Sequence, residues 1–227
     1  MTTYAGIEQD EKHVEHVKAL AAKTGKNLAT QFEQLDVFED DIRLTLPPST
    51  FDCVALFNDG HRLMETEASA RRCFSNAAHL LRPSGYFIGL IHDGAAIWYA
   101  LQKEQPEAPV PEDYVPSFRR SLFSVTTGSI IETRVGAKYS FKVRKEEPGS
   151  ASISVRDGNL VNPTECCRLA QESGLSLVHM INAGVFFEQY RGVYGEALKK
   201  KATSKDLLRE QREVIDMYAF FVFQKKK

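Results

Sequence analysis

The chain has 227 residues, 43% of them hydrophobic and 26% charged, with a formal net charge of -1. This balance is typical of a globular domain and excludes a general basic surface for nucleic acid, so any RNA contact has to be local. The sequence has no apolar run of about eighteen residues and no signal peptide, so we expect an intracellular protein without a membrane span.

Short predicted strands and helices alternate through the first 95 residues. Gly25 ends the first helix, Thr66 caps the second, and Pro83 and Gly85 stop it. The expected strands lie within 2–9, 29–38, 47–57 and 86–94, and the expected helices within 10–25 and 66–85. This alternation predicts an α/β fold with a mostly parallel sheet and right-handed crossovers.

The pattern changes after residue 95. The proline-rich stretch 96–120 predicts a loop or lid, and an antiparallel excursion is expected after residue 115. Strands are expected at 121–127, 136–145, 151–158, 175–181 and 219–226, and helices at 162–174 and 203–218. We therefore expect a single domain over residues 1–227, divided into 1–95, 96–120 and 121–227.

The cysteines and histidines give no metal signal. Two of the four cysteines, Cys166 and Cys167, are adjacent, and none has a C-x-x-C spacing, which argues against zinc and against a disulfide framework. His13 and His16 lie three residues apart on an expected helix, a spacing at which both could bind one metal ion. No third ligand lies nearby in the sequence, so a solvated helix face is the better interpretation. We expect no metal.

Polar residues end three successive strands of the first part: Glu8, Asp36 and the turn Asn58–His61. Ligands of open parallel sheets bind outside the carboxyl ends of the strands. An acid at this edge that accepts hydrogen bonds from two ribose hydroxyls is common in nucleoside-binding sites, and a second acid can accept a hydrogen bond from the amine of adenine. Together they predict a nucleoside pocket; alternatively, each acid only caps its own loop.

The segment FDCVALFNDGHRLMETEASARRCFSNAAHLLRPSGYFIGL, residues 51–90, resembles the RNA cap guanine-N7 methyltransferases. The residues that fit the family pattern without a gap are His61, Glu65, 70–72, Asn76, Leu81, Pro83 and 85–89. Three later segments are similar to further family signatures: GAKYSF at 136–141, FFEQY at 186–190 and MYAFFVFQK at 217–225. The likeness extends from about Tyr4 to the last residues.

The resemblance implies a Rossmann-like class I S-adenosylmethionine-dependent methyltransferase sheet whose last strand is antiparallel. It implies methyl transfer from S-adenosyl-L-methionine to N7 of the cap guanosine. Because N7 is already nucleophilic, proximity and electrostatic positioning suffice and no catalytic side chain is expected. The implied partners are capped RNA and either a capping-enzyme subunit or a chain that completes the cofactor site, and the implied location is the nucleus.

Site residues follow from the motif positions that this chain shares with the family. On the cofactor side, within residues 1–95, the resemblance assigns the ribose to Glu8, the adenine amine to Asp36 and a further contact to Phe57. On the cap side, the resemblance assigns Phe141, Asp157 and Tyr218, within 121–227, together with His61 of the turn at 58–61. Asp157 falls in place only with an insertion around 144–152; its carboxylate would accept from guanine N1 and N2.

The chain also departs from the family. It begins at what looks like the family's second strand, it lacks the glycine-rich turn after the first, and Arg62 stands where the family has an aromatic residue. Three explanations stay open: an incomplete gene model of an active enzyme, a non-catalytic methyltransferase-like subunit or cap-binding accessory protein, or an enzyme completed by a partner. Arg62 favours a divergent member over a simple truncation. The segments 136–141 and 217–225 disfavour a small-molecule methyltransferase.

Overall fold

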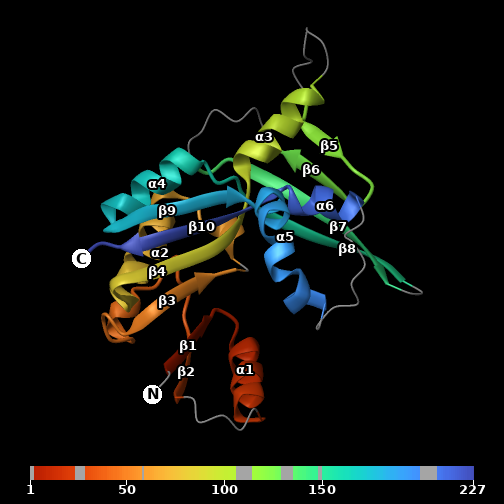
Figure 1. Ribbon diagram of the computed structural model, residues 1–227. Helices are drawn as coiled ribbons and strands as arrows, with labels where there is room; N and C mark the ends of the chain where they lie inside the picture. Colours follow the sequence, from red (N-terminus) through yellow and green to blue (C-terminus); the bar gives the residue numbers. More distant parts are fainter. Residues whose placement is uncertain are drawn as a thin grey trace.

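The computed structural model describes residues 3–23, 29–57, 59–105, 114–128, 135–147, 150–199 and 209–227 (Figure 1). Its helices are α1 (Glu11–Lys23), α2 (Glu67–Leu80), α3 (Gly94–Lys103), α4 (Pro163–Glu172), α5 (Ala183–Lys199) and α6 (Arg209–Ile215), with 3-10 turns η1 (Ile42–Leu44) and η2 (Gly60–Arg62). Its strands are β1 (Thr3–Glu8), β2 (Ala29–Gln34), β3 (Phe51–Leu56), β4 (Leu81–His92), β5 (Ser117–Arg119), β6 (Phe123–Thr127), β7 (Lys138–Glu147), β8 (Ser150–Asn159), β9 (Leu175–Asn182) and β10 (Tyr218–Lys225).

Within the described residues the strands form three sheets, with the orders β1-β2, β3-β4-β10-β9 and β5-β6-β7-β8. The β1–β2 and β3–β4 pairs are parallel, whereas β10 runs antiparallel to both β4 and β9. The predicted α/β architecture is therefore confirmed, including an antiparallel last strand. The antiparallel excursion is confirmed as the sheet β5-β6-β7-β8.

Helices α2 and α4 cover one face of the central sheet (Figure 1). The predicted cap of α2 is confirmed: Thr66 Oγ1 accepts a hydrogen bond from the Ser69 backbone N–H at 3.0 Å. Phe74 of α2 packs edge-on against Phe87 of β4 and Phe223 of β10, and all three are at most 1% exposed. Burying one such ring contributes about 1.5–3 kcal/mol, so this layer anchors the sheet.

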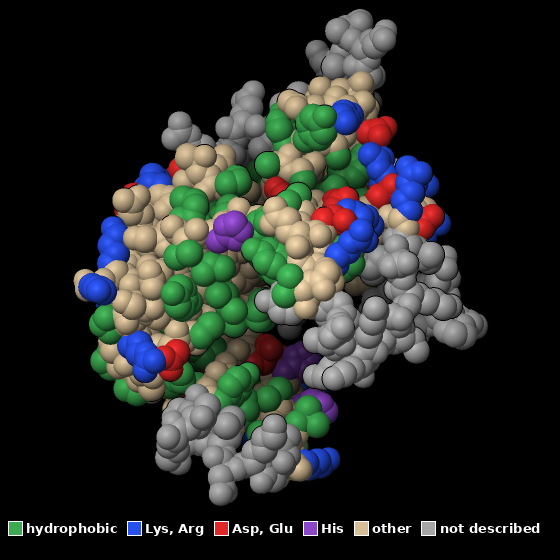
Figure 2. Space-filling model, viewed as in Figure 1, with side chains coloured by type: hydrophobic (Ala, Val, Ile, Leu, Met, Phe, Trp, Pro, Cys, Tyr) green, Lys and Arg blue, Asp and Glu red, His purple; other side chains and the backbone are tan. Residues whose placement is uncertain are grey.

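The opposite face of the central sheet carries hydrophobic side chains that no matching layer of helices covers in the described part of the chain. Along β4 and β10 the alternate positions Tyr86, Ile88, Phe220 and Val222 are half-buried or exposed, while their neighbours are buried on the helix side. Figure 2 shows hydrophobic side chains gathered over these strands, and Figure 1 shows α5 standing at one end of that face. A two-sided α/β sheet normally has both faces covered.

Two helices were not predicted from the sequence. Helix α3 occupies residues expected to start the lid: Asp93 accepts from the Ala95 and Ala96 N–H groups at 3.1 Å, and Ile97 and Leu101 bury one face. Helix α5 follows β9 directly. The remaining lid residues 106–113, Asn58 and the expected helix start at 203–208 lie outside the described residues. No helix of the described ranges is long and apolar enough to cross a membrane.

Candidate functional site

A cavity of about 560 Å³ lies between β1 and β3; we name it the β1–β3 cavity. Its walls include β1 from Tyr4 to Glu8 and most of β3, and its rim includes the loops that follow β1, β2 and β3. Glu8, Asp36 and Phe57 all line it, so the three residues predicted for the cofactor lie at one cavity. The volume is in the range of small-molecule sites.

Glu8 ends β1 and bends back onto its own loop. Its Oε1 accepts from the backbone N–H groups of Gln9 at 2.8 Å and Asp10 at 3.2 Å. These contacts fix the carboxylate at the cavity wall. A carboxylate offers about four lone pairs, so acceptor capacity remains for hydroxyl groups of a ligand.

Asp36 follows β2, and both of its oxygens are engaged. Oδ1 accepts from the Phe38 N–H at 2.9 Å, and Oδ2 accepts from Arg62 Nη2 at 2.9 Å. The loop is further fixed by Asn76, a buried residue of α2 whose Nδ2 donates to the carbonyls of Val37 and Asp40. Asp36 is thus an oriented acceptor at the cavity rather than a free loop acid.

Arg62 reaches into the same cavity from η2. Its Nη1 donates to Gln9 Oε1 at 2.9 Å, and its guanidinium carbon lies 4.8 Å from the centre of the Phe38 ring. Burial alone lowers the Arg62 pKa, but the hydrogen bond and charge of Asp36 outweigh it, so the pKa is raised and the guanidinium stays charged. The sequence identified Arg62 only as a departure from the family, because its reach across to β1 and β2 is a tertiary feature.

Two of the residues predicted for the cap side, Phe141 and Tyr218, meet in an aromatic cluster with His92 and Tyr139. The His92 ring stacks on Phe141 with 4.7 Å between ring centres and lies 4.5 Å from Tyr218. Phe141 and Tyr218 are 6.0 Å apart. Phe141 is 1% exposed, so it forms the inner support of the cluster, whereas Tyr218 is half-buried.

His92 is the polar centre of this cluster, and sequence analysis did not select it. Its Nδ1 contacts the Tyr139 hydroxyl, and its Nε2 is buried without a hydrogen-bond partner among the described residues. Burial, followed by the charges of His61 and Arg156, lowers the His92 pKa to about 3, and burial raises the pKa of Tyr139 and of Tyr218. The cluster is therefore neutral at physiological pH. The sequence signal that pointed to His92 was its place at the polar end of an expected strand, in the stretch IHDG at 91–94.

His61 lies between the two regions. It belongs to η2 directly before Arg62, and an added Cβ on Gly158 of β8 would lie 2.8 Å from His61 Cβ and 3.2 Å from the Tyr139 hydroxyl. Gly158 therefore allows β8 to approach the turn closely. This approach places His61 next to the aromatic cluster.

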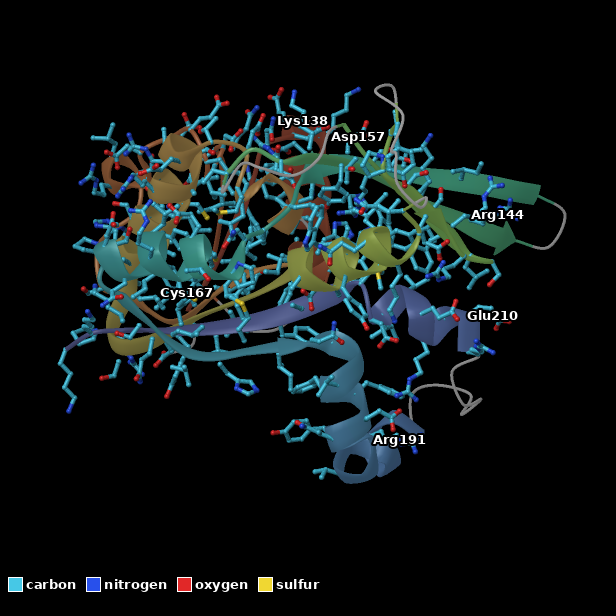
Figure 3. All side chains as sticks on the ribbon, turned by 90° about the horizontal axis from the view of Figure 1, so that it is seen from above. Lys138, Arg144, Asp157, Cys167, Arg191 and Glu210 are labelled. Atoms are coloured by element: carbon cyan, nitrogen blue, oxygen red, sulfur yellow. The ribbon has the colours of Figure 1, made fainter. Side chains whose placement is uncertain are left out.

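Asp157 does not join the other predicted residues. In the β7–β8 register it pairs with Ser140, while Phe141 pairs with Arg156. Since successive strand residues point to opposite faces, Asp157 and Phe141 belong to opposite faces of this sheet. Asp157 is exposed, and Figure 3 shows it near Lys138 at the same outer side. Its role in base recognition stays a prediction.

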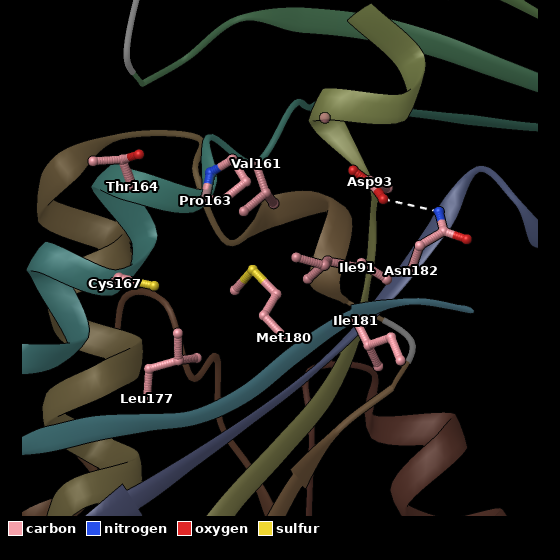
Figure 4. A pocket seen from close by; sticks show the side chains of 12 residues that line it. Ile91, Asp93, Val161, Pro163, Thr164, Cys167, Leu177, Met180, Ile181 and Asn182 are labelled. Atoms are coloured by element: carbon pink, nitrogen blue, oxygen red, sulfur yellow. Dashed lines mark hydrogen bonds between the residues drawn. The ribbon is translucent and has the colours of Figure 1, made fainter. Parts of the chain in front are cut away.

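A second cavity, of about 400 Å³, lies between α4 and the strands β9 and β10 (Figure 4). There Asn182 Nδ2 donates to Asp93 Oδ2 at 2.9 Å and to the Asp216 carbonyl at 2.7 Å, while its Oδ1 accepts from the Gly184 N–H. These bonds tie the starts of α3, α5 and β10 together. None of the predicted site residues lines this cavity, and in the described part of the chain no cluster of three potential metal ligands occurs.

The fold is that of the class I S-adenosylmethionine-dependent methyltransferases. Two solved structures illustrate the fold: a methyltransferase from Clostridium acetobutylicum (TM-score 0.53, 8% identity, 98% of this chain and 75% of that one) and the CcbJ methyltransferase from Streptomyces caelestis (TM-score 0.54, 13% identity, 98% and 74%). These identities establish the fold alone.

The sequence comparison is more specific. The family model of the mRNA (guanine-N(7))-methyltransferase domain matches residues 4–226, so the chain belongs to that family. It is 27% identical over 236 aligned residues to mRNA cap guanine-N(7) methyltransferase 2 of Arabidopsis thaliana and 28% identical to its counterpart in Oryza sativa. Each match covers 98% of this chain but only 65% and 67% of the respective relative, so the chain spans about two thirds of their length.

Proposed function

We propose that the protein transfers a methyl group from S-adenosyl-L-methionine to N7 of the guanosine at an mRNA cap. The observation that carries the proposal is the convergence of Glu8, Asp36 and Phe57 on the β1–β3 cavity within a chain of the cap methyltransferase family. When bound, the cofactor supplies an electrophilic methyl group. Glu8 would accept from the ribose hydroxyls, Asp36 would accept from the adenine amine, and Phe57 would pack beside the nucleoside.

The guanine would bind on the other side of η2, between His61 and the aromatic cluster. Tyr218, half-buried and next to His92, offers a ring face for stacking, and Phe141 supports it from within. His92 is neutral, so its ring adds no positive charge beside the purine, on which positive charge develops during transfer. These residues bind and orient; none has to abstract a proton from N7.

Methyl transfer to capped RNA tests this proposal. The purified protein is incubated with methyl-labelled cofactor and RNA that starts with GpppA, and the cap is released by nuclease and analysed for 7-methylguanosine. Label in 7-methylguanosine is expected, with none on RNA that starts with ApppA. Label absent from the cap, or present elsewhere in the RNA, would contradict the proposal.

A second candidate is a non-catalytic methyltransferase-like subunit that binds caps or a capping-enzyme subunit. The free edge of β3 favours it: among the described strands β3 pairs with β4 alone, and the β1–β3 cavity separates it from β1. A strand from another chain that paired with this edge would complete the cavity wall and cover hydrophobic surface. Cap-analogue binding without methyl transfer would support this candidate, and slowed hydrogen exchange of β3 amides in a complex would support the partner.

The cap function also implies a nuclear location, because capping acts on nascent mRNA. Imaging of the tagged protein in its own cells tests this directly. Nuclear signal is expected, and exclusion from the nucleus would contradict it.

A further inference from the structure

Arg62 ties together three separate segments at the mouth of the β1–β3 cavity. Its two Nη atoms each donate at 2.9 Å, one to Gln9 after β1 and the other to Asp36 after β2. Arg62 itself belongs to η2, next to His61. A single side chain therefore fixes both strand ends against the turn that carries the predicted cap residue.

The contacts of Asp36 define how its carboxylate can meet a ligand. One oxygen is held by the Phe38 N–H and the other by Arg62, so rotation of the carboxylate is blocked at both ends. Each oxygen keeps a further lone pair. An oriented carboxylate with spare lone pairs accepts from an amine at a defined place, whereas a rotating one would lose that selectivity.

Arg62 is itself held in place. Its side chain is 22% exposed, and its guanidinium lies 4.8 Å from the ring of Phe38, which is 3% exposed. The planar fork of a guanidinium can bond Gln9 and Asp36 at once, which the single ammonium group of lysine does less well. The contact with Asp36 also neutralises a cation that would otherwise repel a positively charged cofactor.

We propose that Arg62 is a positioning residue that orients the Asp36 carboxylate toward the 6-amine of adenine, so that the cavity discriminates adenine from a purine with oxygen at that position. The inference rests on the proposed function, because it takes the cavity as the cofactor site. It assigns a role to the residue that replaces the aromatic of the family. It does not require Arg62 to touch the cofactor.

Calorimetric titration with two probes tests the proposal. S-Adenosylhomocysteine carries the 6-amine, and S-inosylhomocysteine has a carbonyl oxygen there. Wild-type protein is expected to bind the first about tenfold more tightly than the second, the difference due to one charge-assisted hydrogen bond. In Arg62→Gln this preference is expected to fall to less than about twofold, mainly through weaker S-adenosylhomocysteine binding. Arg62→Lys should restore part of it.

Arg71→Gln is the matched control, since Arg71 also bonds two carboxylates, Glu67 and Glu172, but does not line the cavity. It should keep the tenfold preference. An equal loss for both probes in Arg62→Gln, or an unchanged preference, would overturn the positioning role while leaving the cofactor site intact. Wild-type protein that binds neither probe would overturn the proposed function as well.

Discussion

The β1–β3 cavity and the aromatic cluster lie on either side of η2, and they differ in almost every physical property. The cavity has a mostly apolar lining into which the charged groups of Glu8, Asp36 and Arg62 are set. The cluster contains buried rings around a neutral histidine. In the cluster, the same side chains that would shape the cap side also join two sheets, with His92 and Tyr218 from one and Tyr139 and Phe141 from the other. We therefore expect substitutions of exposed cavity residues to change binding with little loss of stability, and substitutions in the cluster to change both.

The largest expected effect is on the cluster. Phe141→Ala should lower the free energy of unfolding by about 3–5 kcal/mol, because it opens a hole under His92 and Tyr218. Phe57→Ala, at a ring that is 52% exposed, should lower it by less than about 1 kcal/mol. Urea denaturation measures both. Similar losses for the two variants would remove the contrast between the regions.

The pH dependence of stability should report on His92. Its folded pKa of about 3 lies below the unfolded value of 6.5, so the unfolded state binds the proton more tightly between these values. Stability from the neutral histidine is fully present well above pH 6.5 and is lost as pH falls toward 3, by at most about 1.4 kcal/mol per pH unit. Wild-type protein should lose about 2 kcal/mol more than His92→Phe between pH 6.5 and about 4.5. Parallel curves would contradict a buried, neutral His92.

Asp36→Asn should change both binding and stability. Asparagine keeps an acceptor for the Phe38 N–H but loses the charge and the oxygen that accepts from Arg62, so affinity for S-adenosylhomocysteine should fall about tenfold and the free energy of unfolding by about 1–2 kcal/mol. Calorimetry and urea denaturation measure the two quantities. Asp52→Asn, at an exposed residue of β3 that pairs with Arg82, is the control and should leave affinity unchanged.

The smallest expected effect is that of Tyr139→Phe. This variant keeps the ring packing and removes the hydroxyl that contacts His92 Nδ1, so the free energy of unfolding should fall by about 1 kcal/mol. Chemical denaturation at pH 7.5 checks it, with Tyr99→Phe on an exposed tyrosine as the control. An unchanged free energy of unfolding would mean that the hydroxyl is stabilised as much by water in the unfolded state as by His92 in the folded state.

Local sequence signals predicted the parts of the fold that depend on neighbouring residues. Thr66 at the start of α2 and the polar ends of β1, β2 and β3 are visible in the sequence, and the structure places Glu8 and Asp36 at one cavity. Helix α3 was missed because the proline-rich residues that follow it dominated the prediction for 96–120. Its signal was present in Asp93, which caps it, and in Ile97 and Leu101 one turn apart.

The parts that sequence analysis missed depend on contacts between distant segments. Arg62 acquires its partners from β1 and β2, and His92 is buried by Tyr139 and Tyr218 of two other strands. The face occupied by Asp157 depends on a strand register that an insertion around 144–152 left undefined in the sequence. A shift by one residue turns a side chain to the other face, so motif position alone could not place it.

The central claim is that the β1–β3 cavity binds the cofactor through Glu8 and Asp36. Titration calorimetry of S-adenosylhomocysteine into wild-type protein and into the Glu8→Gln, Asp36→Asn double variant tests it most directly. We predict micromolar binding by the wild type and loss of that binding by the folded double variant. Equal affinity in the two proteins, or no binding to the wild type, would contradict the claim.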